Sequence, residues 1–187
     1  MKGFISIVAC LSILSAAACA QQSSNVEPEF LLDTPQQVKD MRAAVKQSGS
    51  FADAFAQQKS YIDSKVSLAP NVPIPADAGG GYTHEVHKKN YADMLIAGRL
   101  FVLSQDIQYA EYVKNILFAY ADLYPTLPLH PKQKEQSPGK LFWQSLNEAV
   151  WLVHVSQAYD AVYDALSAGE RAFIEKDLLR PVATFLS

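Results

Sequence analysis

The chain has 187 residues, 49% of them hydrophobic, so it is long enough for one domain with a buried core. Its formal net charge of -3 at pH 7 gives no overall electrostatic reason to expect a nucleic-acid partner. Positive charge is local instead, because residues 130–140 hold three lysines and one glutamate. Such a stretch is typical either of a solvated loop or of a site for a small anionic ligand.

Residues 1–20 have the pattern of an export signal, with a positive start, an apolar run at 4–14 and small residues before a cleavage site. The run of about eleven residues is too short to span a bilayer. Cleavage after Ala20 predicts a periplasmic protein without an anchor, and cleavage before Cys19 predicts a lipid anchor on that cysteine. Ala16 stands where lipoprotein signals more often have leucine, which favours the first product.

Both cysteines, Cys10 and Cys19, lie in this signal. The exported domain is therefore expected to have no disulfide, no thiol nucleophile and no thiolate metal site. Residues 21–31 are expected to be a flexible lead-in, and residues 32–187 are expected to form the folded domain.

Hydrophobic spacing and helix-end signals predict six helical segments and no strand. Thr34 and Pro35 read as an N-cap followed by proline at the first helical position. The first predicted helix ends at Gly49, and the second spans 50–66 with Phe51, Phe55 and Ile62 in the core. Further helices are predicted at 83–103, at 106–124 and from about 141. The last begins at a capping box at 167–170, and Pro181 is expected to kink or divide it.

Two long loops rich in proline separate these helices, at about residues 70–81 and 126–139. Long irregular loops are often functional. The three glycines at 79–81 either let the backbone approach another group closely or form a flexible linker.

His84 and His87 open the helix after the first loop, with Glu85 between them. A zinc-protease helix needs histidines four residues apart, and here the spacing is three, so no metal site is predicted. A surface or capping role and a ligand-binding role both remain open for these histidines.

Residues 136–151 contain both tryptophans of the chain, together with Gln144, Asn147 and Glu148. Amides and a carboxylate among large aromatic rings suit a sugar site, and the alternative is a packed helix whose polar residues face water. At about 100° per residue, the following residues share one arc of the helix: Trp143, Asn147, Trp151, His154 and Ala158. Leu146, Val150 and Val153 form an adjacent apolar stripe that is expected to face the core, and His154 is expected to be half-buried and hydrogen-bonded.

Three segments carry a resemblance to a known family: residues 79–85, reading Gly-Gly-Gly-Tyr-Thr-His-Glu, His130-Pro131, and residues 136–152. In these the chain resembles the exported oligoalginate lyases of the alginate lyase and heparinase II/III type, from about residue 32 to the end. The resemblance implies an all-α fold, an incomplete (α/α) toroid of helical hairpins, followed by an antiparallel β-sheet domain. The sequence shows no such β domain, so a truncated chain is expected.

The resemblance also implies a reaction, β-elimination on alginate or its oligosaccharides, which leaves an unsaturated uronate end. The substrate carboxylate must be neutralised, a base must remove the C5 proton, and an acid must protonate the leaving O4. No metal or cofactor is required. The catalytic tyrosine and an asparagine–histidine pair are expected beyond Ser187. A non-catalytic periplasmic saccharide-binding or scaffold module is the alternative function, and a zinc hydrolase using His84 and His87 is disfavoured.

The resemblance places a set of residues on the wall of the substrate cleft. The expected substrate-binding residues are Tyr82, His84, Lys134, Ser137, Lys140, Gln144, Asn147 and Glu148, with Lys134 and Lys140 as partners of the substrate carboxylate. The expected partner is an alginate oligosaccharide, and neither a nucleic acid nor a membrane span is expected.

Overall fold

The structure is a computed structural model and describes residues 30–187. The predicted export signal at 1–20, with Cys10 and Cys19, and nearly all of the lead-in lie outside the described residues. The described part contains no strand, and the predicted all-α class is confirmed. Its helices are α1 (Pro35–Ala44), α2 (Ser50–Asp63), α3 (Tyr82–Ser104), α4 (Ile107–Leu123), α5 (Ser145–Val162), α6 (Ala168–Ile174) and α7 (Arg180–Leu186), with short turns η1 (Tyr124–Thr126) and η2 (Tyr163–Ala165) and a π segment η3 (Glu175–Leu179).

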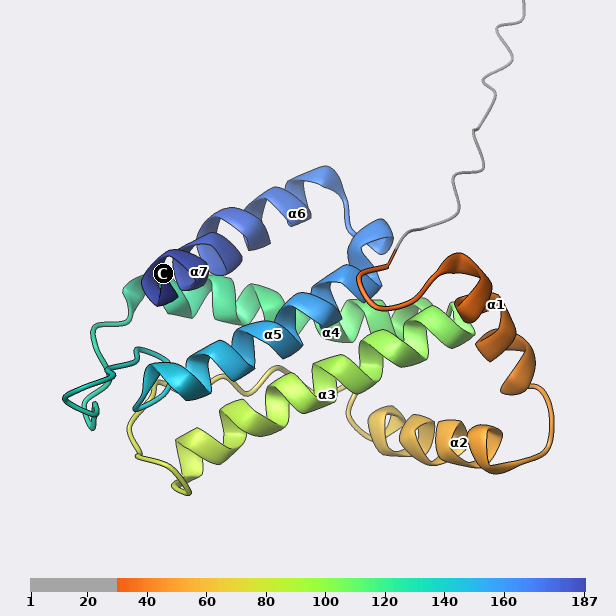
Figure 1. Cartoon of the computed structure of the whole chain (residues 1–187), viewed down its shortest axis with the longest axis horizontal. Helices are drawn as coiled ribbons and strands as arrows, with labels where there is room; N and C mark the ends of the chain where they lie inside the picture. The colour runs from red at the N-terminus through yellow and green to blue at the C-terminus, as the bar shows by residue number, and fades with distance from the viewer. Residues whose placement is uncertain (1–29) are drawn as a thin grey trace, which may run out of the picture.

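The long helices α3, α4 and α5 form the centre of the molecule (Figure 1). Helices α3 and α5 pack side by side and run in the same direction. Helix α4, which lies between them in the sequence, runs antiparallel to both. The pairs α1–α2 and α6–α7 pack against this centre from either side. The two long loops therefore both meet the bundle at the end where α3 and α5 begin (Figure 1).

The contact between α3 and α5 depends on small side chains. A Cβ atom placed on Gly98 would lie 3.0 Å from the Cβ of Ala161 and 3.5 Å from the carbonyl oxygen of Ala158. Larger residues at these positions would hold the two helices apart. The close approach lets α4 complete the core with a buried face that repeats at helical spacing, including Tyr109, Val113, Leu117 and Tyr120.

Both predicted N-terminal caps and the predicted division before Pro181 are confirmed. The side chain of Thr34 accepts a hydrogen bond from the backbone N–H of Gln37, and the side chain of Gln37 accepts one from the backbone N–H of Thr34. Pro35 lies in the first helical turn. Ser167 and Glu170 form the same reciprocal pair at the start of α6. Before Pro181, which lacks an N–H group, the regular helix is interrupted by the π segment η3, so the predicted division is present.

Several sequence predictions are wrong. Helix α1 ends at Ala44 rather than at Gly49, which lies at the N-cap of α2 with a φ of 141°. Phe51 is 43% exposed rather than in the core, whereas Ile62 is fully buried as predicted. Helix α5 begins at Ser145 and not near residue 141, so Trp143 lies in the preceding loop and not on the predicted helical arc.

The buried face of α5 also differs from the prediction. The stripe of Leu146, Val150 and Val153 is exposed, at 67%, 40% and 54%. The core instead receives the opposite set, comprising Glu148, Trp151, Val155, Ala158 and Val162. The helix has apolar residues on nearly every side, so hydrophobic spacing alone could not identify the face that packs.

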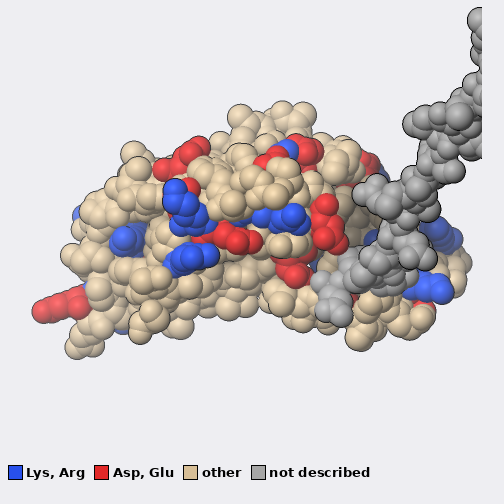
Figure 2. Space-filling model, turned by 90° about the horizontal axis from the view of Figure 1, so that it is seen from above, with Lys and Arg blue, Asp and Glu red and all other residues tan. Residues whose placement is uncertain are grey.

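The surface on the α6 side carries lysine, arginine, aspartate and glutamate side chains interspersed with one another (Figure 2). Among the described residues, no helix combines the length and the apolar character that crossing a membrane requires.

Candidate functional site

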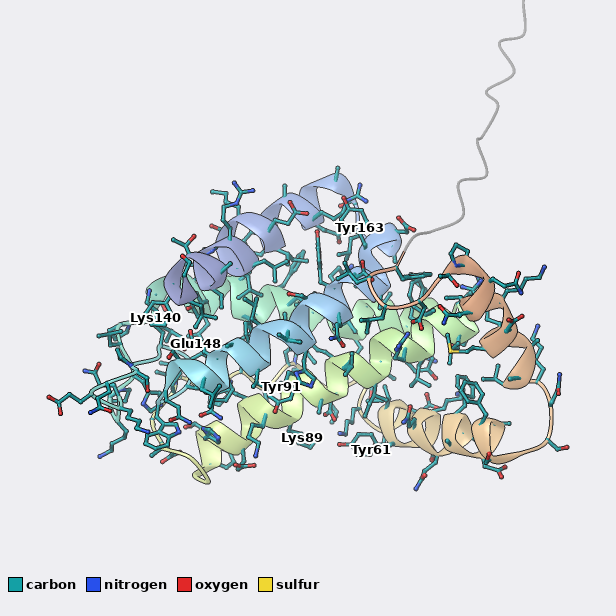
Figure 3. All side chains as sticks on the ribbon, viewed as in Figure 1. Tyr61, Lys89, Tyr91, Lys140, Glu148 and Tyr163 are labelled. Atoms are coloured by element: carbon teal, nitrogen blue, oxygen red, sulfur yellow. The ribbon has the colours of Figure 1, made fainter. Side chains whose placement is uncertain are left out.

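The candidate residues predicted from the sequence gather at the end of the bundle where α3 and α5 begin. Tyr82 and His84 lie in the first turn of α3, and Gln144, Asn147 and Glu148 lie at the start of α5. The other three, Lys134, Ser137 and Lys140, belong to the loop of residues 127–144 that leads into α5, here named the basic loop. Figure 3 shows Lys140 and Glu148 together at this end.

The basic loop is closed by its own backbone. The N–H of His130 donates to the carbonyl of Gly139 at 2.8 Å, and the N–H of Lys134 donates to the carbonyl of Trp143 at 2.8 Å. The N–H of Ser145, the first residue of α5, donates to the carbonyl of Ser137 at 3.0 Å. These bonds fix the loop against the start of α5, and Ser137 contributes to them through its backbone.

Glu148 anchors the basic loop from below. Its side chain is fully buried, and its two oxygens accept hydrogen bonds from the Tyr124 hydroxyl at 2.6 Å and from the Lys140 N–H at 2.7 Å. Burial raises the pKa of the Glu148 carboxyl, against the opposing effect of these donors. The position of Glu148 is thus beneath the loop rather than on its outer surface.

Gly139 is the residue that lets the loop close over Glu148. A Cβ atom here would lie 2.2 Å from the carbonyl oxygen of Phe142 and 2.8 Å from Oε2 of Glu148. No side chain fits in this space without moving the backbone or the carboxylate. Neither Gly139 nor Tyr124 was predicted as a site residue, and the available signal for Tyr124 was its place directly before Pro125, just after α4 ends.

The outer layer of this end combines amides, a cation and aromatic rings. The Gln144 side-chain amide donates to Oδ1 of Asn147 at 2.7 Å, which orients the Asn147 amide. The ammonium of Lys134 lies 5.9 Å from the centre of the Trp143 ring. A Cβ on Gly79 would lie 3.3 Å from Nε1 of Trp143, so the glycine loop before α3 reaches the same tryptophan.

Two other candidates differ from this group in their surroundings. Tyr82 is 69% exposed. The ammonium of Lys140 lies near the rings of Tyr124 and Phe185, at 5.6 Å and 5.3 Å, and so reaches toward α7 while Lys134 reaches toward Trp143. The two lysines expected as partners of the substrate carboxylate therefore associate with different aromatic groups.

The histidines near the start of α3 are buried, so the surface or capping role left open for them is wrong. His84 meets the edge of the Phe142 ring at 5.2 Å, and Nδ1 of the fully buried His87 lies 2.9 Å from the Tyr120 hydroxyl. His130 is buried as well and accepts the Lys132 N–H at 3.0 Å. Burial lowers the pKa of all three histidines, that of His87 to about 4.

His154 lies further along α5, where its Nδ1 is 2.7 Å from the Val150 carbonyl and its ring packs on Tyr91 at 4.7 Å. The predicted half-buried, hydrogen-bonded position is confirmed. Within residues 30–187, no group of three or more His, Cys, Asp or Glu side chains is arranged to hold a metal ion.

Gly139→Ala is expected to lower the free energy of unfolding by about 3 kcal/mol, because the added methyl group overlaps Phe142 and Glu148. The matched control is Gly169→Ala in α6, where nothing lies within 4 Å of the added Cβ. This control should be neutral or stabilising by up to about 1 kcal/mol through helix propensity. Thermal and urea unfolding of both variants measures the difference, and equal stability of the two would contradict the steric account of the loop.

Lowering the pH from 7 to 5 is expected to destabilise the protein through His87. The folded-state pKa is about 4 and the unfolded chain protonates near 6.5, so protonation favours the unfolded chain. The stabilising effect of the neutral ring is complete above pH 6.5 and is lost as the pH falls toward and through 4. We expect about 2 kcal/mol of the change in unfolding free energy between pH 7 and pH 5 to come from His87.

Urea unfolding at pH 8, 7 and 5 of the wild type and of His87→Gln measures this effect. The variant should show the smaller change between pH 7 and pH 5, and the two proteins should run parallel between pH 8 and pH 7, where the ring is mostly neutral in both states. A variant that loses as much stability as the wild type at pH 5 would show that His87 is not responsible.

The sequence of the chain is similar to the sequences of two known proteins. No family model matches the chain. The chain is 45% identical over 175 residues to an exo-oligoalginate lyase of Saccharophagus degradans and 42% identical over 175 residues to an alginate lyase of Stenotrophomonas maltophilia. Each match covers 94% of this chain but only 24% and 23% of the relative, so the chain spans about a quarter of the length of the relatives. The resemblance predicted from the sequence is thereby confirmed: over nearly its whole length, the chain is similar to a segment of these two lyases.

Proposed function

We propose that the chain is part of a lyase that degrades alginate or its oligosaccharides by β-elimination, and that it forms one wall of the cleft that binds the uronate polymer. The observation that carries this proposal is the similarity to two alginate lyases over 94% of the chain. The chemistry of the basic loop and of the start of α5 supports it. In this proposal the described residues bind and orient the substrate, and none of them is given a bond-breaking role.

The outer layer has the groups that an anionic sugar needs. The ring of Trp143 can pack against the apolar face of a sugar, and the exposed ring of Tyr82 offers a second such surface. Lys134, held near Trp143, can pair with a uronate carboxylate. The oriented amides of Gln144 and Asn147 can donate to hydroxyl or carboxylate oxygens.

The start of α5 adds to this preference for an anion. Gln144 occupies the N-cap without a side-chain capping bond, and the backbone dipoles of the 18-residue helix favour negative charge at this end. The bond-breaking step needs neutralisation of the substrate carboxylate so that the C5 proton becomes acidic. Lys134 and the amides contribute to the binding of that carboxylate from this wall of the cleft.

Glu148 has a supporting role in this proposal. It lies beneath the loop and holds Lys140 and Gly139 in place, so it acts on the substrate only through the position of the loop. His84 likewise packs behind the loop on Phe142. We further propose export to the periplasm through residues 1–20, with a lipid anchor at Cys19 as the alternative product.

Alginate oligosaccharides are expected to bind to the purified chain without being cleaved. Isothermal titration calorimetry measures the binding, and the ultraviolet absorbance of the conjugated uronate product measures cleavage. Turnover by the chain on its own would contradict the purely binding role of its residues. Failure of every oligosaccharide to bind would contradict the cleft itself.

Asn147→Ala is expected to weaken binding of alginate oligosaccharides about tenfold, because one oriented amide is lost from the cleft wall. The fold should lose less than about 1 kcal/mol, since the broken hydrogen bond to Gln144 is only partly buried. The matched control is Asn115→Ala on the exposed side of α4, which should leave both properties near the wild type. A fall in the melting temperature with unchanged affinity of the folded fraction would make Asn147 a structural residue.

A further inference from the structure

A second cluster of charged residues lies between α2, α3 and α4, about two to three turns along α3 from Tyr82. It borders a cavity of about 200 Å³, here named the Asp93 pocket. Figure 3 shows Tyr61, at the end of α2, and Lys89, on α3, side by side in this region. The cavity is lined by Lys65, Leu68, Ala69, Pro70, Asn71, Val86, Lys89, Asn90, Asp93, Tyr112 and Ile116.

Asp93 is the buried centre of the cluster, with only 3% of its surface exposed. One of its oxygens, Oδ2, accepts hydrogen bonds from the ammonium groups of both Lys65 and Lys89, each at 2.7 Å. The other, Oδ1, accepts the Tyr61 hydroxyl at 2.9 Å. Lys65 is itself largely buried and lies 3.4 Å from the centre of the Tyr61 ring.

The charges of this cluster do not cancel. One ammonium would balance the carboxylate of Asp93, and the second leaves a net charge of +1 beside the cavity. Each ammonium carries three N–H donors, of which one goes to Asp93. Donors therefore remain on both lysines, and both residues line the cavity.

The remaining walls of the pocket suit a sugar ring. Leu68, Val86 and Ile116 provide apolar surface. The side-chain amide of Asn90 is fixed by hydrogen bonds to the carbonyl of Asn71 at 2.8 Å and to the Tyr120 hydroxyl at 3.1 Å. The volume lies below the roughly 300 Å³ of pockets that hold drug-sized ligands, so it has room for one small group rather than for a polymer.

We propose that the Asp93 pocket is a second binding site for a single uronate, whose carboxylate bridges Lys65 and Lys89 and whose ring lies against the apolar wall. The carboxylate specificity follows from the two ammonium groups. The choice of a uronate as the sugar rests on the proposed function. The pocket is distinct from the cleft wall at the basic loop, because the two share none of the contacting residues named for them.

The test is a titration of the ¹⁵N-labelled chain with mannuronate monosaccharide, followed by NMR of the side-chain amides. The Asn90 amide reports on the Asp93 pocket, and the Gln144 and Asn147 amides report on the cleft wall. We expect saturable shifts of the Asn90 signal. Shifts at Asn147 without shifts at Asn90 would overturn the second site and leave the proposed function standing. Shifts at Asn90 without shifts at Asn147 would contradict the proposed cleft wall and leave the second site standing.

Two substitutions at neighbouring lysines separate a specific site from general surface charge. Lys89→Gln should weaken mannuronate binding at Asn90 about tenfold, because one of the two ammonium groups is lost. Lys88→Gln removes the same charge one residue away, from a lysine that pairs with Glu85, and should leave the Asn90 titration unchanged. Equal weakening by both variants would overturn the proposal.

A third variant tests the bridging geometry. Asp93→Asn keeps the shape of the side chain but removes the carboxylate that competes for the lysines, so mannuronate should bind several-fold more tightly. Unchanged or weaker binding by the folded variant would show that the lysines serve only the ion pair with Asp93. Because Lys89 is more exposed than Asp93, Lys89→Gln retains the test if Asp93→Asn does not fold.

Acetate that binds as tightly as mannuronate would overturn the assignment to a sugar.

Discussion

The hydrogen bonds of Glu148 set the geometry on which the candidate cleft depends. A carboxyl group removed from water is unfavourable unless donors replace the lost water molecules. Here the Tyr124 hydroxyl and the Lys140 N–H replace them, and they come from the end of α4 and from the basic loop. Any movement of the loop away from α5 would remove the Lys140 donor and leave one oxygen of the buried carboxyl without it, so the loop is held in one position above the helix.

The parallel arrangement of α3 and α5 determines what that loop can meet. Because α3 and α5 run in the same direction, their first turns lie at the same end of the bundle (Figure 1), and Gly98 lets the two helices approach closely. The glycine loop before α3 and the basic loop before α5 are then brought together, although they are far apart in the sequence. Gly79 reaches Trp143, and Phe142 covers His84. The site is consequently a product of helix packing, and neither loop could form it alone.

Local signals account for what the sequence predicted correctly. The capping pairs at Thr34 and Ser167 need only a few neighbouring residues, and both are present. Gly49 was misplaced because glycine suits both the end of one helix and the start of the next, and only the surrounding structure decides between them. The exposed stripe containing Leu146 was assigned to the core because α5 is apolar on several sides, while its rotation is set by Glu148 and Trp151, which pack against other segments.

The candidate site shows the same division. The resemblance to the oligoalginate lyases grouped the segments that meet at the start of α3 and α5, whereas the residue types alone left a packed helix as the alternative to a sugar site. The sequence did not reveal that Glu148 and His84 are buried, since burial depends on Tyr124 and Phe142 from other parts of the chain. It also missed the Asp93 pocket. The spacing of Lys89 and Asp93, four residues apart, was a usable signal, but Lys65 joins them only through the packing of α2 on α3.

Two buried carboxylates, Glu148 and Asp93, illustrate how the choice of donor decides what a site can bind. Glu148 accepts hydrogen bonds from a hydroxyl and a backbone N–H, which are neutral donors and add no charge. Burial raises the pKa of its carboxyl. Its donors add no positive charge, so attraction of a uronate at the basic loop must come from Lys134 and the amides. Asp93 is met by two ammonium groups, so its surroundings keep a positive charge. A buried carboxylate whose donors are all neutral can hold a loop in place. A buried carboxylate with two ammonium partners has one positive charge more than it needs, and a second carboxylate can bind there.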